Sequence, residues 1–434
     1  MRVKRICLIA LLIAALLLPG CAMRTVDQMY CLPKRTEDHN NLQVAVDAAM
    51  VDLEYCAPLS GENQQTLQSA DLDGDGDEEY LLYAKGSSEM PLRIMIFDES
   101  GSSFSHVTTI ECNGLAFDTV EYVQMDTCKG LEIVVGCQVS DQQLRSVSIY
   151  QYSNKQALRL HQTGYIKFMP VDLNADGILE LFVLRPGSTD NDRGIAELYS
   201  IHNGSVQRSN EVNMSASGDK LKRMILGNLN DGKPAVFTAC SVEDTALITD
   251  VFTIQDARLV NVSLSNESGT SVNTLRNYYV YAEDIDQDGV VELPYLISTA
   301  NSDGTMTNEK HDLIRWYGMN SDGSEVDKLF TYHNFADGWY LVLDRKWADK
   351  LTVRQTGNSY DFYINNDMAF SISVLTGPNR NEEATKDGRF SLIKNDSVVY
   401  CAVLYDVGQQ YEITQESITK SFRLIETKWN TGET

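Results

Sequence analysis

The sequence predicts an all-β fold, a β-propeller of seven blades with a short helix before the first blade. Short segments rich in β-branched and aromatic residues recur along the chain between Asn-Gly, Asp-Gly and Ser-rich turns. An acidic turn followed by such a segment repeats about every 50 residues, which is the length of four short strands and their turns. The chain of 434 residues is also too long for one ordinary core and suits a repeat architecture.

The first 20 residues have the composition of a secretion signal. Cations at positions 2, 4 and 5 precede an uncharged apolar run of 13 residues, Ile6 to Leu18. A membrane-spanning helix takes about 20 apolar residues, so this run is short for a span and fits the apolar region of a signal peptide. No other stretch of the sequence is long and apolar enough to cross a membrane. We therefore predict that residues 1–20 are a signal peptide and that the protein is exported.

The apolar run ends in Leu18-Pro19-Gly20-Cys21, which resembles the bacterial lipobox. The resemblance implies cleavage before Cys21, a lipid on the Cys21 thiol, and anchoring to the outer face of the bacterial cell membrane. Residues 21–41 are polar and without a pattern, and we expect them to be a lipidated tether. The alternative is an ordinary signal peptide in which Cys21 is incidental.

The chain is strongly acidic, with 61 Asp and Glu against 36 Lys and Arg. Removal of the three cations of the signal takes the formal net charge from −25 to −28. Such a surface repels nucleic acid and attracts cations, so we expect no nucleic-acid partner and some neutralisation by metal ions. The hydrophobic fraction of 43% is that of a globular chain and not of a disordered acidic tail.

Seven cysteines remain once Cys7 leaves with the signal and Cys21 takes the lipid: Cys31, Cys56, Cys112, Cys128, Cys137, Cys240 and Cys401. No CxxC pair occurs, which argues against zinc-ribbon and thioredoxin-like chemistry. An exported protein can form disulfides, and the spacing allows Cys31 with Cys56, and Cys112 with Cys128 or Cys137. The alternative is a set of buried free thiols.

Three segments share the pattern D-x-[DN]-x-D-G-x-x-E followed by an apolar strand: Asp71 to Glu79, Asp172 to Glu180 and Asp284 to Glu292. Weaker copies begin at Asp126 and Asn228, and only an Asp-Gly turn with a following strand remains at Asp337 and Asp387. One blade for each of these seven turns gives the predicted ring, because a blade buries its faces only against its neighbours.

The acidic segments predict calcium sites. Calcium takes six to eight oxygen ligands, and acids at alternate positions of a tight turn direct several oxygens to one point. The glycine at the sixth place permits the left-handed backbone of such a turn. Place 12 carries no acid and a strand follows, so these turns are not EF-hands. The alternative is an ion-free acidic hairpin.

Places 1, 3, 5 and 9 are the predicted side-chain ligands, namely Asp71, Asp73, Asp75 and Glu79, then Asp172, Asn174, Asp176 and Glu180, then Asp284, Asp286, Asp288 and Glu292. Place 7 would supply a backbone carbonyl, from Asp77, Ile178 and Val290. We expect a structural role for the ion, and we expect the weaker copies at residues 126 and 228 to bind none.

The repeated D-x-D-x-D-G-x-x-E turn before a strand resembles the FG-GAP/VCBS repeat, which is known from the seven-bladed propeller of integrin α chains and from bacterial surface proteins. The resemblance covers residues 65–300 directly and the remainder by its period. It implies the propeller fold and calcium, and it does not imply a ligand.

The remaining elements are assigned by periodicity. Apolar residues between Leu42 and Leu53 fall on one helical face and predict the short N-terminal helix. Residues 42–330 are assigned to propeller blades, and residues 331–434 either to further blades that close the ring or to a separate small β domain. Tryptophans and tyrosines gather in the last third, at Trp316-Tyr317, Trp339-Tyr340 and Trp347. They predict either a stacking surface for a ligand or the filling of blade interfaces.

No catalytic motif is present: the sequence lacks GxSxG, HExxH, GxGxxG and the phosphate loop, and its six histidines show no ligand spacing. The leading expectation is therefore a lipid-anchored, calcium-stabilised propeller, not an enzyme, that binds or scaffolds a protein or glycan partner through its loops. One alternative is an enzyme that acts on extracellular polysaccharide, which a pocket of converging Lys or Arg, Tyr and acids would favour. The other is a purely structural component of the cell envelope.

Overall fold

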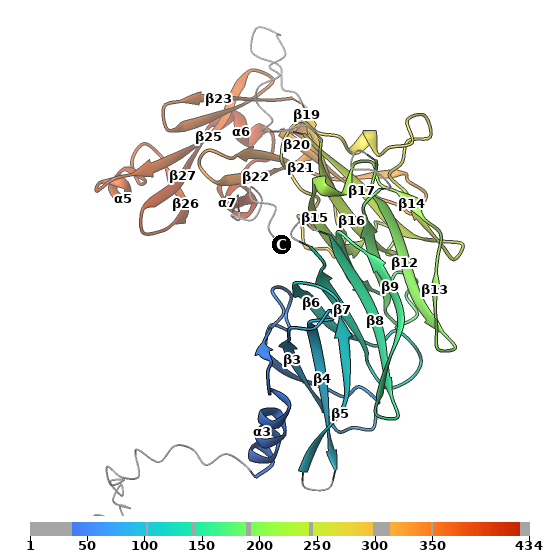
Figure 1. Cartoon of the computed structure of the whole chain (residues 1–434). Helices are drawn as coiled ribbons and strands as arrows, with labels where there is room; N and C mark the ends of the chain where they lie inside the picture. Colours follow the sequence, from blue (N-terminus) through green and yellow to red (C-terminus); the bar gives the residue numbers. More distant parts are fainter. Residues whose placement is uncertain are drawn as a thin grey trace, which may run out of the picture.

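A computed structural model of the chain describes residues 37–100, 103–140, 144–187, 192–242, 246–297, 313–348 and 350–425. These residues form six antiparallel sheets, which we number 1 to 6 in chain order, and a few short helices (Figure 1). The predicted all-β class is confirmed. The predicted signal peptide, the predicted lipid site at Cys21, and Cys31 lie outside the described residues. Among the described helices, none is long and apolar enough to cross a membrane.

Sheets 1 to 4 follow one another along the chain. Sheet 1 contains β1 (Glu54–Tyr55), β2 (Leu67–Ala70), β3 (Glu79–Lys85), β4 (Leu92–Ser100) and β5 (Ser103–Cys112). Sheet 2 contains β6 (Ala116–Val123), β7 (Glu132–Gln138), β8 (Arg145–Ser153) and β9 (Gln156–Gly164). Sheet 3 contains β10 (Lys167–Val171), β11 (Glu180–Arg185), β12 (Ile195–His202), β13 (Ser205–Arg208) and β14 (Val212–Asn213). Sheet 4 contains β15 (Leu221–Asn228), β16 (Pro234–Val242), β17 (Ala246–Gln255) and β18 (Arg258–Asn261).

Sheets 5 and 6 complete the described chain. Sheet 5 contains β19 (Leu293–Ile297), β20 (Leu313–Met319), β21 (Glu325–Asn334), β22 (Trp339–Leu343) and β28 (Phe422–Leu424). Sheet 6 contains β23 (Leu351–Thr356), β24 (Ser359–Ile364), β25 (Asp367–Thr376), β26 (Phe390–Lys394) and β27 (Val398–Leu404). The helices are α3 (Glu37–Ala49), α4 (Arg345–Ala348), α5 (Arg380–Glu383), α6 (Asp406–Gln410) and α7 (Gln415–Ser421), with 3-10 turns at Gly218–Lys220 and Val272–Thr274.

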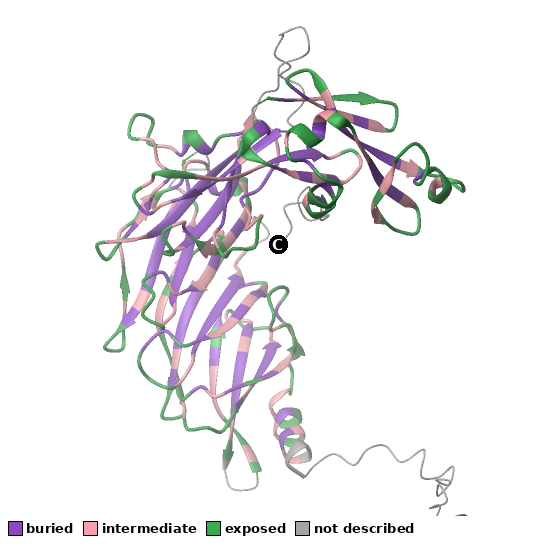
Figure 2. Ribbon diagram, turned by 180° about the vertical axis from the view of Figure 1, so that it is seen from behind, coloured by how far each residue is buried: buried purple, intermediate pink, exposed green. Residues whose placement is uncertain are grey.

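Consecutive sheets are held together by cores between their faces. In β3, Leu81 and Tyr83 face the core shared with sheet 2, whereas Leu82 and Ala84 face the opposite side, as the two-residue period of a strand requires. Similar cores join sheets 2 and 3, 3 and 4, 4 and 5, and 5 and 6. The central strands are therefore buried along most of their length (Figure 2).

The helix α3 covers the free face of sheet 1. Leu42 and Val46 pack on Leu82, Met95 and Phe97. The helix begins at Glu37 and ends at Ala49, so the prediction of a helix from Leu42 to Leu53 was right in place and wrong in its bounds. It ends early because Asp52 has a left-handed backbone, with φ of 60°. The last five residues of the predicted tether are helical.

The sheets follow one another in an open arc, with sheet 1 near one end and sheet 6 near the other (Figure 1). The predicted ring of seven blades is not confirmed, because the described residues form six sheets and α3 occupies the face of sheet 1 that a last blade would cover. The Asp-Gly turn at Asp337 lies in the hairpin between β21 and β22, inside sheet 5, and begins no new sheet. An Asp-Gly pair suits many hairpins, so without the other acids it does not identify the loop.

Sheet 6 has the strand order β23-β24-β25-β27-β26, in which β27 lies between β25 and β26. The chain between sheets 5 and 6 runs through α4, so the domain boundary expected at residue 330 falls inside β21. Trp316, Trp339 and Trp347 are buried, the last two in the core between sheets 5 and 6. Of the two interpretations of the aromatic cluster, the filling of sheet interfaces is confirmed.

Acidification from pH 7 to pH 5 should destabilise the wild-type protein relative to the variant His333→Phe. His333 in β21 is buried among the rings of Trp316, Phe335 and Tyr340. Burial lowers the pKa of His333 from 6.5 to about 3. Between these values the unfolded chain binds a proton that the folded chain does not, so stability present above pH 6.5 is lost as the pH falls, by about 2 kcal/mol at pH 5.

The measurement is the urea midpoint of both proteins at the two pH values. Comparison with the phenylalanine variant isolates His333, because every other titrating group is common to both proteins. An equal loss of stability in the two proteins would contradict the prediction.

Candidate metal centres

The three acidic loops occupy equivalent places in three sheets. The first joins β2 to β3, and the second joins β10 to β11. The third begins directly after Glu283, which forms an antiparallel bridge with Glu292 in front of β19. The ninth residue of each loop therefore lies at or just before the start of the next strand. The strand fixes the position of this residue, and the loop turns in front of it.

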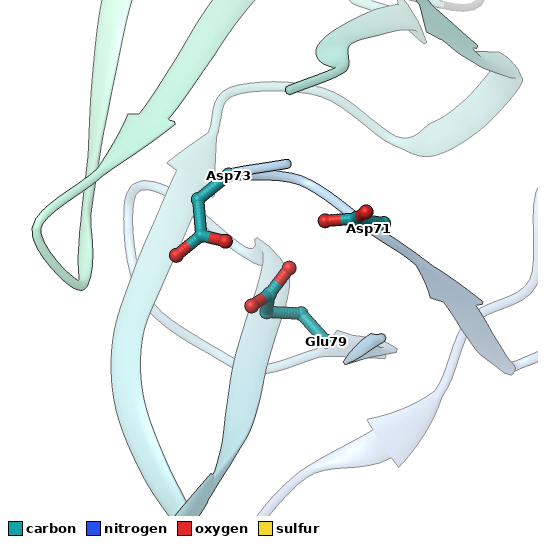
Figure 3. A group of neighbouring side chains, drawn as sticks. All are labelled: Asp71, Asp73 and Glu79. Atoms are coloured by element: carbon teal, nitrogen blue, oxygen red, sulfur yellow. The ribbon is translucent and has the colours of Figure 1, made fainter. Parts of the chain in front are cut away.

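In the first loop, the carboxylates of Asp71, Asp73 and Glu79 converge (Figure 3). Each offers one oxygen, and these oxygens lie within 4.8 Å of one another. The loop backbone holds them: Asp71 accepts the amide hydrogens of Gly74 at 2.8 Å and Gly76 at 3.2 Å, and Glu79 accepts that of Leu72 at 2.7 Å. These bonds hold three acids together at one point.

The third loop repeats this arrangement with Asp284, Asp286 and Glu292. Glu292 is fully buried, and its Oε2 accepts the amide hydrogen of Ile285 at 3.1 Å. Its Oε1 is also buried and has no hydrogen-bond partner among the described residues. A buried carboxylate oxygen without a partner is costly, so this atom marks a position that a cation would satisfy.

The second loop brings Asp172, Asp176 and Glu180 within the same 4.8 Å limit. The predicted ligand Asn174 lies beside them but makes a different contact, because its side-chain amide donates a hydrogen bond to Oε1 of Glu180. Its own Oδ1 accepts the amide hydrogen of Asp176 at 2.8 Å. The amide therefore partly takes the place that a bound cation would have in such a loop.

The substitution Asn174→Asp is expected to raise the calcium affinity of the second loop about tenfold, because a fourth carboxylate adds attraction for the ion and the amide donor is lost. The same substitution should lower stability without metal, since the added charge repels its neighbours. Calorimetric titration in a background of Asp73→Ala with Asp286→Ala would isolate this loop. Asn366→Asp, in the exposed β24–β25 turn of sheet 6, is the matched control. Unchanged or weaker binding by Asn174→Asp would refute the expectation.

Places 5 and 7 form a common turn in all three loops. The place-5 carboxylates accept the backbone amide hydrogens of place 7, from Asp77, Ile178 and Val290. Of the place-5 acids, only Asp176 joins the converging oxygens, and Asp288 instead pairs with Lys328 at 2.8 Å. In each loop the structure thus groups three of the four predicted side-chain ligands as converging acids.

The backbone of the loops is left-handed at two places. The glycines at place 6 have φ of 100°, 86° and 89°, as predicted. Place 4 is also left-handed, at Gly74, Ala175 and Gln287, with φ of 76°, 60° and 64°. Ala175 and Gln287 adopt this disfavoured conformation where the surrounding hydrogen bonds impose the turn. The sequence pattern did not show this second constraint.

Burial raises the pKa of the ninth-place glutamates, Glu79, Glu180 and Glu292, to about 7 each. The backbone hydrogen bond to each carboxylate opposes this effect, and repulsion by the neighbouring aspartates adds to it. Burial also raises the pKa of Asp73 and of Asp286. A bound cation would reverse these costs, because it favours the ionised form of every acid around it.

The weaker copy in sheet 2 is displaced from its predicted alignment. Glu132 accepts the amide hydrogen of Met125 at 2.9 Å, seven residues before it, just as Glu79 accepts that of Leu72. Met125 therefore occupies place 2 and Asp126 place 3, not place 1. Gln124 then stands at place 1, where the three acidic loops have aspartate. This loop therefore keeps the hydrogen bond from place 2 to place 9 but lacks the set of acids.

The weaker copy in sheet 4 contacts its neighbour in sheet 5. Asn228 donates from its side chain to the carbonyl of Gly289 at 3.0 Å, and Asp231 accepts a hydrogen bond from Ser321 at 2.6 Å. The carboxylate of Asp231 thus makes a contact between sheets 4 and 5. Among the described residues, neither weaker copy forms a group of three converging acids.

No family model matches this chain, and no curated protein matches it. The resemblance to the FG-GAP/VCBS repeat therefore depends on the loops themselves and stays a prediction.

Proposed function

We propose that this protein is a lipid-anchored, calcium-stabilised β-propeller of the bacterial cell surface, open as an arc, that binds or scaffolds a protein or glycan partner. The observation that carries the proposal is the threefold recurrence of one loop, each with three converging acids directly in front of a strand. The stacking of consecutive sheets through shared cores supports the propeller architecture. The lipobox-like Leu18 to Cys21 supports the anchor.

The donor set suits calcium. Every converging ligand is a carboxylate oxygen, the donor that calcium and magnesium prefer, and no histidine or thiol joins any of the three groups. The buried and unpartnered Oε1 of Glu292 fits a cation at that loop. Calcium would neutralise the acids and fix the turn between two strands, so we assign it a structural role. Calcium accepts six to eight oxygens in flexible geometry, whereas magnesium demands a near-ideal octahedron and usually keeps several waters, so a loop with many oxygen donors suits calcium better.

Isothermal titration of the metal-free protein with calcium tests the proposal. We expect sites at all three loops, and dissociation constants on the order of 10⁻⁴–10⁻³ M are usual for extracellular calcium modules. Magnesium should bind more weakly at each site. Absence of calcium binding, or tighter binding of zinc than of calcium, would overturn the assignment.

The anchor is tested separately by expression of the full chain and of Cys21→Ala in a bacterial host. The wild-type protein should fractionate with membranes, and protease should cleave it on the cell surface. The alanine variant should be released or remain unprocessed. A wild-type protein found in the soluble cytoplasm would contradict the anchor and leave the metal assignment to its own test.

A further inference from the structure

A polar pocket lies away from the acidic loops, where sheets 2 and 3 meet the segment between β1 and β2. Its cavity measures about 540 Å³. Small-molecule sites usually have volumes of about 300–1,000 Å³. Asp118, Thr119, Glu121, Arg145, Tyr165 and Lys167 are among its lining residues, and we call it the Asp118 pocket. β10 begins at Lys167 in the pocket and ends at Val171, directly before the second acidic loop, so the two sites lie toward opposite ends of one strand.

A β-bulge in β6 positions the acids of the pocket. The pairing of β6 with β7 shifts between Phe117 and Thr119, which leaves Asp118 as the extra residue. Phe117 and Val120 face the core with sheet 1. In a regular strand, one residue separates two neighbours that face the same side. Here the bulge puts two residues between Phe117 and Val120, so Asp118 and Thr119 both lie toward sheet 3. Bulges of this kind redirect a side chain, and they are common beside functional sites.

The carboxylate of Asp118 is held by two partners. It is 7% exposed, accepts a short hydrogen bond from the hydroxyl of Tyr165, and lies 3.5 Å from the guanidinium of Arg145. Gly136 leaves the space for this contact, because a Cβ at that position would lie 2.5 Å from the Tyr165 hydroxyl. Burial and the hydrogen bond to Asp118 raise the pKa of Tyr165, so Tyr165 stays a donor.

The other groups of the pocket are not paired in the same way. Lys167 is exposed at the start of β10 and forms no ion pair with a described residue. Glu121 is half-buried, and a Cβ on Gly61 would lie 3.5 Å from its carboxylate. Burial raises the pKa of Glu121, and the charge of Glu62 adds to this effect. Two cations, two acids and Tyr165 thus line one cavity with the aromatic ring of Phe168, which is the kind of pocket named above for a polysaccharide-acting enzyme. Tyr165 stays protonated and donates to Asp118, so the pocket offers it as a hydrogen-bond partner and not as a base.

We propose that the Asp118 pocket binds a neutral, hydroxyl-rich ligand, a saccharide unit of a glycan. Each sugar hydroxyl both donates and accepts, so it can bridge a carboxylate and a neighbouring cation, and the pocket offers both. The formal charges of the pocket cancel, which gives an ionic ligand no net attraction. The acidic protein as a whole, with a net charge of −25, repels an anionic polysaccharide. The inference rests on the proposed function and specifies its glycan partner.

Binding is tested on the full chain, purified in detergent with millimolar calcium, against a panel of neutral tetrasaccharides of gluco, manno, galacto and xylo configuration. A uronate tetrasaccharide and an uncharged tetrapeptide complete the panel. We expect saturable binding of at least one neutral saccharide. Asp118→Asn and Glu121→Gln should each weaken it about tenfold or more, since each removes a charged hydrogen-bond acceptor.

Asp118 is buried, so its variant could fail to fold, and Lys167→Gln provides a second test at an exposed position. Asp256→Asn, in the β17–β18 turn, is the matched control and should bind like the wild type. Binding of no neutral saccharide, tighter binding of the uronate or the peptide, or binding that all three pocket variants leave unchanged would each overturn the inference. A calcium titration on a chelator-treated portion of the same preparation separates the two proposals: calcium binding without saccharide binding refutes only the pocket, whereas absence of calcium binding refutes the calcium assignment.

Discussion

We expect millimolar calcium to raise the thermal unfolding midpoint of this protein by several degrees, and Asp73→Ala combined with Asp286→Ala to remove most of the rise. Both residues occupy place 3 of an acidic loop, are exposed, and lie in a group of three converging acids. Calcium at about 1 to 10 times its dissociation constant stabilises a protein by about 0.4–1.4 kcal/mol per site. The double variant keeps only the second loop and should lose about two thirds of the gain.

Calorimetry with excess chelator and then with excess calcium is the measurement. The control is Asp367→Ala with Asp396→Ala, two exposed acids outside the loops, which should keep the full response. Without metal the double variant should be at least as stable as the wild type, because it removes repulsion around Glu79 and Glu292. A calcium response of equal size in the wild type and the double variant would show that the ion acts elsewhere.

We expect oxidation with glutathione disulfide to link Cys112 to Cys137 and to stabilise the junction of sheets 1 and 2. Cys112 ends β5 and Cys137 lies in β7, and both are buried in the core that the two sheets share. A hydrogen bond from Cys137 lowers the pKa of Cys112, and the hydroxyl of Tyr150 lies 3.5 Å from its sulfur. The alternative partner Cys128 is exposed on the loop after β6. The structure therefore favours Cys137 between the two pairs that the spacing allows.

The chemistry is a two-step exchange. The Cys112 thiolate attacks one sulfur of glutathione disulfide and releases one glutathione, and the Cys137 thiol then displaces the second. The product closes a loop of about 26 residues, for which loop entropy corresponds to about 3.5 kcal/mol of stability. The reaction should be slow in the folded protein, because both sulfurs are buried and the sheets must open locally to admit the reagent.

Peptide mapping without reduction, and urea unfolding of the oxidised and reduced proteins, test this prediction. Cys128→Ser should leave both the cross-link and the gain in stability intact, whereas Cys112→Ser should abolish both. A cross-link from Cys112 to Cys128, or an oxidised protein no more stable than the reduced one, would contradict it.

The acidic loops could be predicted from the sequence because their structure is local. The bonds that shape the first loop join residues no more than seven apart, from Leu72 to Glu79. Where the acids were missing, the prediction failed in register: Asp126 was aligned as a first acid, but the bond from Met125 to Glu132 places it third. The Asp-Gly turn at residue 337 was wrongly assigned to a new blade for the same reason, because two residues do not specify which strands they join.

The sequence by itself determined the all-β class, the acidic turns and their ligand types, since strand alternation and turn geometry depend on neighbours along the chain. Only the tertiary structure decided how the sheets meet, that α3 covers sheet 1, and that Cys112 meets Cys137. It also decided that a bulge in β6 brings Asp118 to Tyr165, which lies 47 residues away in the sequence. These contacts join distant segments, and the packing of faces that creates them leaves no periodic signal in the sequence.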